Sequence, residues 1–165
     1  MLAINLLRRR LPLTRGKVAF VDALDPKEPW RFKWRAQRDG NTFYAARNVR
    51  LGKGRWTVQT LHKFLTEAPQ TDHQDCDGLN NQRYNLRPCT SQQNNANRRK
   101  SKGCSSDFKG VYWDKRDSRW CSQIGVNGKT IRLGRFADEV EAANAYNESA
   151  ILHYGEFARL NQLPT

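Results

Sequence analysis

Four polar residues in the middle of the chain have the chemical types that phosphodiester hydrolysis requires. Asp72 and His73 are adjacent, Asn85 follows His73 by twelve positions, and Asn94 follows Asn85 by nine. A neutral imidazole suits a general base near neutral pH, and an amide can hold that ring in one tautomer. A carboxylate and a second amide oxygen suit a hard cation such as Mg²⁺ or Mn²⁺. The segment therefore contains one residue for each task in cutting a nucleic-acid backbone.

Each of these residues also has a plainer explanation when taken alone. An Asp-His pair in a polar loop is commonly exposed to solvent, and Asn residues commonly stabilise turns. Short motifs also arise by chance. The four residues together, at these gaps, favour the catalytic interpretation. Asp75 and Asp77, in the same polar stretch, are interpreted as loop residues that tune the local electric field.

Strand and helix patterns surround this polar segment. Residues 17–23 are β-branched and apolar enough for a strand, and residues 32–37 and 42–48 flank an Asp-Gly-Asn turn that predicts a hairpin. Apolar residues at helical spacing, Val58, Leu61 and Leu65, predict a short helix around 58–66. Residues 85–90 resemble a short strand, which Pro88 confines to a sheet edge.

The segments that flank these elements are basic. A helix is predicted to follow a cap at Thr90 or Ser91 and to continue through residues 92–100. Residues 98–107 form a basic link containing Gly and Ser, where we place a domain boundary. In this link Arg98, Arg99, Lys100 and Lys102 either contact phosphate or the minor groove, or serve as a flexible tether. Arg8 to Arg10 either touch phosphate or lie in a solvated N-terminal tail, and the tail is expected. The basic residues of the N-terminal hairpin either extend a DNA footprint or belong to the scaffold; they are Arg31, Lys33, Arg35 and Arg38.

The C-terminal third predicts a three-stranded sheet and one helix. Strands are expected at 110–115, 119–126 and 129–136, with Asn127-Gly128 as a strong hairpin turn. A helix should start after Asp138 and end near Gly155. Alternation places six apolar side chains on the face toward the helix: Val111, Trp113, Trp120, Ile124, Ile131 and Leu133.

Composition narrows the class of partner. The 165 residues include 29 Lys+Arg and 16 Asp+Glu, giving a formal net charge of +13. A small protein this basic calls for a polyanion, and nucleic acid is the leading candidate. No apolar run approaches a membrane span, and the order of apolar and basic residues at the N-terminus does not suit a secretory signal, so we expect a cytoplasmic protein. Four widely spaced cysteines are expected as reduced thiols, with a mixed Cys/His zinc site a minor alternative.

The middle segment resembles the HNH endonucleases of the phage and intron homing type. The matching stretches are LHKFL (61–65), QTDHQDCDGLNNQRYNLRPCT (70–90) and SQQNNANRR (91–99). The resemblance implies a ββα-metal unit in which Asp72 and Asn94 bind a divalent metal, His73 is the general base and Asn85 orients it. Because Asn94 replaces the usual third His, the pattern favours Mg²⁺ or Mn²⁺ over zinc. His62 is expected in a structural or phosphate-contacting role.

Residues 108–161 resemble the AP-two DNA-binding domain of plant ethylene-response factors. The matching stretches are KGVYW (109–113), WCSQI (120–124), IRLGRF (131–136), EAANAYNESA (141–150) and YGEFARLN (154–161). In that family the exposed sheet face enters the major groove. Alternation predicts that this face includes Cys121, and the resemblance, together with alternation, implies seven DNA contacts: Lys109, Tyr112, Gln123, Thr130, Arg132, Arg135 and Tyr146. Arg132 either reads guanine or is a solvated strand residue.

The sequence therefore predicts an α+β protein in four parts: an N-terminal β-rich region (1–60), a ββα-metal nuclease (61–99), a basic linker (100–107) and an AP-two-like domain (108–165). The expected activity is metal-dependent cleavage of double-stranded DNA, as a nick or a double-strand cut, in a bacterial or phage-infected cell. The expected state is a monomer or weak dimer that needs no small-molecule cofactor. The alternatives are a DNA-binding transcriptional regulator with an inactive nuclease centre, and an RNA-binding or structural protein, for which no single-strand stacking motif is present.

Overall fold

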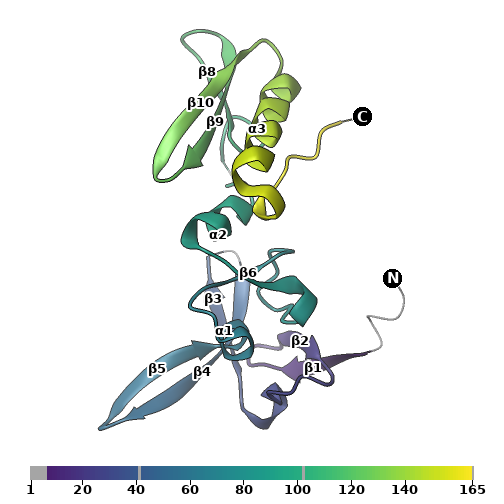
Figure 1. Cartoon of the computed structure of the whole chain (residues 1–165), viewed down its shortest axis with the longest axis vertical. Helices are drawn as coiled ribbons and strands as arrows, with labels where there is room; N and C mark the ends of the chain where they lie inside the picture. Colours follow the sequence, from purple (N-terminus) through teal and green to yellow (C-terminus); the bar gives the residue numbers. More distant parts are fainter. Residues whose placement is uncertain (1–6, 41, 102, 165) are drawn as a thin grey trace. The chain divides into compact units, whose positions relative to one another are not determined.

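The chain has an α+β structure that divides into two compact units. The computed structural model describes residues 7–40, 42–101 and 103–164. Contacts group Met1–Thr90 in the first unit and Ser91–Thr165 in the second (Figure 1). The sequence placed its main boundary at residues 98–107, whereas the structure places it before Ser91. Residues 1–60 and the polar segment around His73 share one unit, because a loop of that segment packs on an N-terminal strand.

The described residues of the first unit form three small antiparallel sheets. Their strands are ordered β1-β2, β3-β4-β5 and β6-β7, and the helix α1 (Leu61–Thr66) follows β5. The bounds are β1 Arg8–Pro12, β2 Val18–Asp22, β3 Arg35–Asp39, β4 Thr42–Gly52, β5 Arg55–Thr60, β6 Thr71–His73 and β7 Leu86–Pro88. The predicted strands near 17–23, 32–37, 42–48 and 85–90 are confirmed. The short helix is present but begins only at Leu61, because residues 58–60 belong to β5, a strand that was not predicted. The predicted turn residue Asn41 lies outside the described residues.

Strand β1 corrects the expected solvated tail. Arg8 to Arg10 pair with β2, and the adjacent Leu11 enters the core at 5% exposure. The Arg8 guanidinium lies 4.6 Å from the Phe20 ring centroid. A hairpin therefore buries an apolar side chain and lets an arginine cover an aromatic ring, which a free tail would forgo.

The core of the first unit joins its N-terminal strands to α1 and β7. Its buried members are Leu11, Ala19, Val21, Trp34, Ala45, Leu61, Leu65 and Leu86. Strand β2 also holds a distant loop, because the Phe20 N–H donates to the Leu79 carbonyl at 2.8 Å and the Asn81 N–H donates to the Phe20 carbonyl at 2.7 Å. The N-terminal strands thus support the segment that follows His73.

The second unit is a three-stranded antiparallel sheet with the helix α3 across one face (Figure 1). The bounds are α2 Ser91–Asn97, β8 Val111–Asp114, β9 Arg119–Val126, β10 Lys129–Phe136 and α3 Glu139–Tyr154. Asp138 accepts hydrogen bonds from the N–H groups of Val140 and Glu141, and Gly155 caps the C-terminus of the helix. The three strands, α3 and both of its caps match the sequence-based expectation, whereas α2 ends at Asn97 and does not continue to residue 100.

Packing against α3 confirms most of the predicted inward face. Val111, Trp120, Ile124 and Leu133 belong to clusters that include helix residues. Ile131 is 39% exposed and lies outside these clusters, which corrects its predicted burial. It lies on the edge strand β10, where a bulge between Arg132 and Gly134 interrupts the regular alternation.

Gly110 must be glycine in this packing. Its φ is +80°, and an added Cβ would lie 2.1 Å from the Tyr146 ring and 2.6 Å from the Gln123 carbonyl oxygen. Any side chain would force the sheet away from the helix, so this position determines how closely β8 and β9 approach α3.

Candidate functional site

Asp72 and His73 lie in a buried hairpin rather than in an exposed loop. In the β6–β7 pairing, Asp72 faces Arg87 and His73 faces Leu86. Asp72 is 4% exposed and His73 is 5% exposed. The Nε and Nη2 atoms of Arg87 donate to Asp72 Oδ2 at 2.9 and 2.8 Å. The cross-strand arginine therefore fixes the direction of this carboxylate.

The His73 imidazole lies in an aromatic and amide environment. Its ring centroid is 5.0 Å from that of His62 and 5.7 Å from that of Tyr44. Its Nε2 atom lies 3.4 Å from Asn81 Oδ1. Burial lowers the pKa of His73 below its usual value, against the opposing effects of the Asn81 hydrogen bond and of Asp75 and other carboxylates. The ring is therefore neutral at pH 7 and able to accept a proton.

His62 comes from α1 and is buried at 8% exposure. Its Nε2 atom lies 3.0 Å from the Thr60 hydroxyl, and its Nδ1 atom has no hydrogen-bond partner among the described residues. Burial, followed by the charges of His73 and Lys63, lowers the pKa of His62 to about 3. This environment supports the structural alternative for His62, because a buried neutral ring is poorly suited to contacting phosphate.

Asn85 holds the loop after His73 rather than the His73 ring itself. Its Nδ2 atom donates to Asp75 Oδ1 at 2.9 Å and to the Asn80 carbonyl at 2.8 Å. Its Oδ1 atom accepts the Asp75 N–H at 3.0 Å. This differs from the expected amide–imidazole contact, since the amide at the ring is that of Asn81. Asn85 therefore holds the loop that follows His73.

Gly78 lets the same loop approach strand β4. An added Cβ would lie 2.5 Å from the Phe43 carbonyl oxygen and 2.6 Å from the Tyr44 ring. Because Tyr44 contacts both histidine rings, this close approach ties the loop to the site. A larger residue would separate the loop from the wall of the site.

The sequence analysis missed the residues that anchor the far side of the loop. Arg83 donates through Nε and Nη2 to Asp25 at 2.7 and 3.2 Å, and through Nη1 to the Leu65 carbonyl at 2.7 Å. The Asp25 side chain is 1% exposed. The sequence does show Asp25 as an acidic residue that follows an apolar strand. Nothing near Asp25 in the sequence indicates that its partner is Arg83, 58 positions away.

Asn94 belongs to the other unit. It lies in α2 and is half-buried, so its pairing with Asp72 around one metal ion stays a prediction. Among the described residues, no cluster of three or more His, Cys, Asp or Glu side chains could hold a metal. The predicted donors are one carboxylate and one amide, and a set of this kind suits a hard cation that retains water and phosphate ligands.

The uncovered face of the second unit's sheet carries the predicted DNA contacts. Thr130 and Arg132 are exposed, and Tyr112 and Gln123 are half-buried. Arg135 is exposed and forms an ion pair with Asp117. A surface pocket of about 290 Å³ lies here, lined by Tyr112, Asp114, Arg116, Cys121, Arg132 and Arg135, among others. Cys121 contributes little surface, since it is 5% exposed rather than displayed as alternation predicted.

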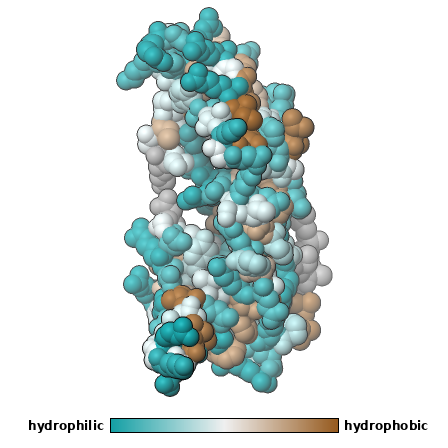
Figure 2. All heavy atoms as spheres, turned by 60° about the vertical axis from the view of Figure 1, so that its left-hand side comes forward, coloured by the Kyte–Doolittle hydropathy of each residue, from teal (hydrophilic) through white to brown (hydrophobic). Residues whose placement is uncertain are grey.

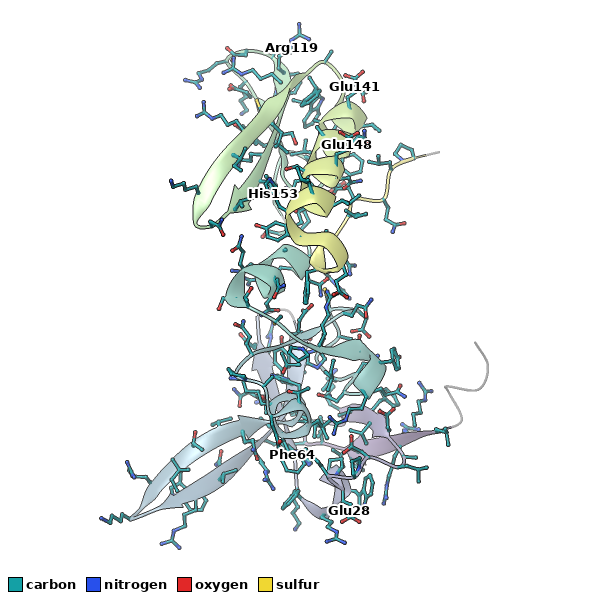
Figure 3. The ribbon with its side chains drawn as sticks, viewed as in Figure 1. Glu28, Phe64, Arg119, Glu141, Glu148 and His153 are labelled. Carbon is teal, nitrogen blue, oxygen red and sulfur yellow. The ribbon has the colours of Figure 1, made fainter. Side chains whose placement is uncertain are left out.

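Charge separates the two faces of this unit. Helix α3 carries Glu139, Glu141 and Glu148 and no Lys or Arg, whereas β9 and β10 carry Arg and Lys and no acidic residue. Figure 3 shows Glu141 and Glu148 along the helix and Arg119 at one end of the sheet. A polyanion would therefore be attracted to the sheet side and repelled from the helix side.

Two predicted DNA contacts have structural roles instead. The Lys109 ammonium donates to the Asn95 and Arg98 carbonyls at 3.4 and 2.8 Å, so it caps the C-terminus of α2. Tyr146 is 3% exposed and packs with Ile124 and Ala150, and burial raises its pKa to about 12. Its position in the core corrects the predicted contact with phosphate.

The basic residues before the sheet differ in their exposure and in their hydrogen bonds. Arg98 and Arg99 are exposed, and the Lys100 ammonium lies 3.4 Å from the Val111 carbonyl oxygen. Lys102 lies outside the described residues. The predicted phosphate contacts of this link stay predictions.

Comparison with known proteins assigns the chain to a family. The sequence is 31% identical over 154 residues to a protein of Acanthamoeba polyphaga mimivirus named as an uncharacterised HNH endonuclease, covering 92% of this chain and 79% of the relative. The chain belongs to the HNH endonuclease family. No family model matches this HNH protein, and no solved structure matches it. None of its described helices has the length and apolar content that a bilayer crossing needs.

Proposed function

We propose that this HNH protein is a metal-dependent DNA endonuclease of the homing type. The observation that supports this most strongly is the β6–β7 hairpin, which buries Asp72 beside His73 and fixes each with a different neighbour. A buried neutral imidazole next to an oriented carboxylate is the arrangement that general-base hydrolysis needs. The exposed basic face of the second unit supplies a surface for double-stranded DNA.

Each residue of the proposed centre has a separate task. His73 accepts a proton from the attacking water, since burial keeps its ring neutral. Asn85 and Asn81 maintain the loop and the orientation of that ring. Asp72, held by Arg87, and Asn94 would bind Mg²⁺ or Mn²⁺. When bound, such an ion would neutralise charge that develops on the scissile phosphate.

The proposed DNA-binding surface has the features of the AP-two resemblance, with changes. Arg132 is exposed and can offer its fork to guanine O6 and N7, which is the commonest specific contact in the major groove. Lys109 and Tyr146 are removed from the contact set by their structural roles. The surface then consists of Tyr112, Gln123, Thr130, Arg132 and Arg135.

Plasmid nicking tests the proposal. Purified protein is incubated with supercoiled plasmid, with and without Mg²⁺, beside His73→Ala and the matched control His153→Ala. His153 is an exposed residue of α3 in the other unit, labelled in Figure 3. We expect metal-dependent nicking by the wild type and by His153→Ala. We expect His73→Ala to bind DNA and to nick it about 10²–10⁴-fold more slowly, because this is the usual contribution of a general base.

The same assay separates the nuclease from a DNA-binding regulator with an inactive centre. Equal and complete survival of the plasmid with wild type and His73→Ala, in Mg²⁺ and in Mn²⁺, would support the regulator. The pH profile gives a further check, because the His73 pKa lies below 6.5. Nicking should persist as the pH falls to about 6.5 and decline only below it.

A further inference from the structure

The strands β4 and β5 form a two-stranded extension that the third strand does not support. Strand β3 pairs with β4 only over residues 42–46. Residues 47–52 of β4 pair with β5 alone, from Arg47↔Gln59 to Gly52↔Arg55. We call residues 47–59 the ribbon. Figure 1 shows it extending away from the other elements of the first unit.

The ribbon exposes large apolar side chains. Leu51, Trp56 and Val58 are 57%, 63% and 50% exposed, and no ribbon residue belongs to the core cluster of the first unit. Trp56 pairs with Arg50 and Val58 pairs with Asn48, so these side chains share one face of the ribbon. Figure 2 shows brown apolar atoms among teal ones over this part of the first unit. An apolar patch rimmed by polar residues is typical of a contact surface.

The charge of the ribbon identifies the class of partner. It contains Arg47, Arg50, Lys53 and Arg55, and the sequence has no acidic residue between Asp39 and Glu67. Arg47 belongs to the root, since its guanidinium lies 3.7 Å from the Phe32 ring centroid and its Nε donates to Gln59 at 2.9 Å. Phe64, labelled in Figure 3, packs at the same root. The other three cations form no ion pair with any described side chain.

We propose that the ribbon is a second DNA-contacting element, which enters the major groove of duplex DNA. The major groove is wide enough for a two-stranded β-ribbon. Arg50 and Arg55 would neutralise phosphates at the groove edge, and the face with Trp56 and Val58 would contact base edges and thymine methyl groups. This inference rests on the proposed function, because it takes duplex DNA as the substrate.

Salt-dependent binding tests the charge of the ribbon. The full chain is titrated onto fluorescein-labelled duplex DNA in EDTA at several salt concentrations, so that no cleavage occurs. The Arg50→Gln/Arg55→Gln variant is compared with Arg15→Gln/Arg31→Gln, which removes the same charge from exposed positions outside the ribbon. Each neutralised phosphate contributes about 0.9 to the slope of log K against log salt, so we expect the ribbon variant to lose about 1.8. The control should lose much less.

Tryptophan quenching tests the apolar face. Trp56 is exposed, whereas Trp30, Trp34, Trp113 and Trp120 are buried or half-buried. Acrylamide should quench the Trp56 emission in free protein, and saturating duplex should protect it. The Trp56→Phe variant should lack the part of the emission that acrylamide quenches and DNA protects, which would assign that emission to Trp56.

The outcomes distinguish this inference from the proposed function. If the wild type binds and nicks DNA but the ribbon variant keeps the wild-type slope, or Trp56 stays quenchable in the complex, the ribbon proposal alone is overturned. If the wild type neither binds nor nicks duplex, both proposals fail. If Trp56→Ala changes the sedimentation coefficient but not DNA affinity, the ribbon is a contact between copies and the proposal is overturned.

Discussion

The β6–β7 hairpin and the β8–β9–β10 sheet contrast in how their polar side chains are held. In the hairpin region, Asp72, Asn85 and Asp25 are each below 5% exposed and each is fixed by named hydrogen bonds. On the sheet, Thr130 and Arg132 are exposed. A general base must be held in place before the reaction, whereas a surface that binds DNA can adjust when the duplex arrives.

The contrast also bears on how residue roles are transferred from a family. Asp72 and His73 lie in a hairpin where hydrogen bonds hold them, and their catalytic roles stay predictions. Two of the proposed DNA contacts, Lys109 and Tyr146, instead stabilise the second unit. A residue at a family's contact position therefore needs an exposed side chain without another structural role before a DNA contact is assigned to it.

The largest expected effect comes from removing Arg83. Arg83→Ala would leave the Asp25 carboxylate buried without its cation and would free the Leu65 carbonyl. Loss of one partner of a buried pair costs about 3–5 kcal/mol, and since the Arg83 side chain is 40% exposed we expect the lower end. Urea unfolding should show a lower midpoint for the first unit and an unchanged midpoint for the second unit.

Arg31→Ala is the control for this substitution. Arg31 forms an exposed ion pair with Glu28, and such pairs contribute about 0–1 kcal/mol. Equal midpoints for Arg83→Ala and Arg31→Ala would show that the Asp25 contact does not stabilise the loop. The buried hydrogen bonds of the hairpin region would then not be what stabilises the first unit.

The sequence predicted most elements of the fold because their patterns are local. Residues 129–136 and the helix after Asp138 have alternation, turn and cap signals that depend on neighbours in sequence. Strand β5 was missed because Val58 was assigned, together with Leu61 and Leu65, to a helical spacing, although Trp56 and Val58 alternate with polar residues in this largely exposed strand. Strand β1 was missed because its arginines find their partners, Phe20 and Trp30, only after folding.

The candidate site was predictable in its residue types but not in its contacts. Asp72 and His73 were found from spacing, yet their partners Arg87 and Asn81 depend on the hairpin register and on a loop conformation. The burial that lowers the pKa of His73 depends on packing by Tyr44 and His62 from two other elements. Contacts of this kind are set by tertiary structure, which periodicity does not reveal.

A smaller effect should come from the pH dependence of stability. The folded pKa of His62 is about 3, below the 6.5 of the unfolded chain. Below pH 6.5 His62 is therefore protonated in the unfolded state but stays neutral in the folded state. The free energy of unfolding is highest above pH 6.5 and decreases as the pH falls toward 3. Between pH 7 and 5 we expect a loss of about 2 kcal/mol from this group.

His62→Phe tests the assignment, because it keeps a ring at the site and removes the unpartnered Nδ1 atom. The variant should lose less stability than the wild type between pH 7 and 5, measured from urea midpoints. His73 contributes in the same direction in both proteins, so only the difference between them reports on His62. Parallel curves would mean that His62 is protonated in the folded state, and the hairpin region would then be less dry than its packing indicates.

The smallest expected effect concerns Lys109, in the second unit. Lys109→Ala removes the ammonium that caps α2, and interactions with a helix C-terminus contribute about 0.3–1 kcal/mol. We expect that loss in the stability of the second unit, with the salt slope of DNA binding unchanged. Arg132→Ala should leave the stability unchanged and weaken specific DNA binding by about 1–3 kcal/mol with little change in the salt slope, because its exposed side chain is proposed to read a base. A reduced slope for Lys109→Ala would show that this lysine neutralises a phosphate in the complex and does not serve only as the cap of α2.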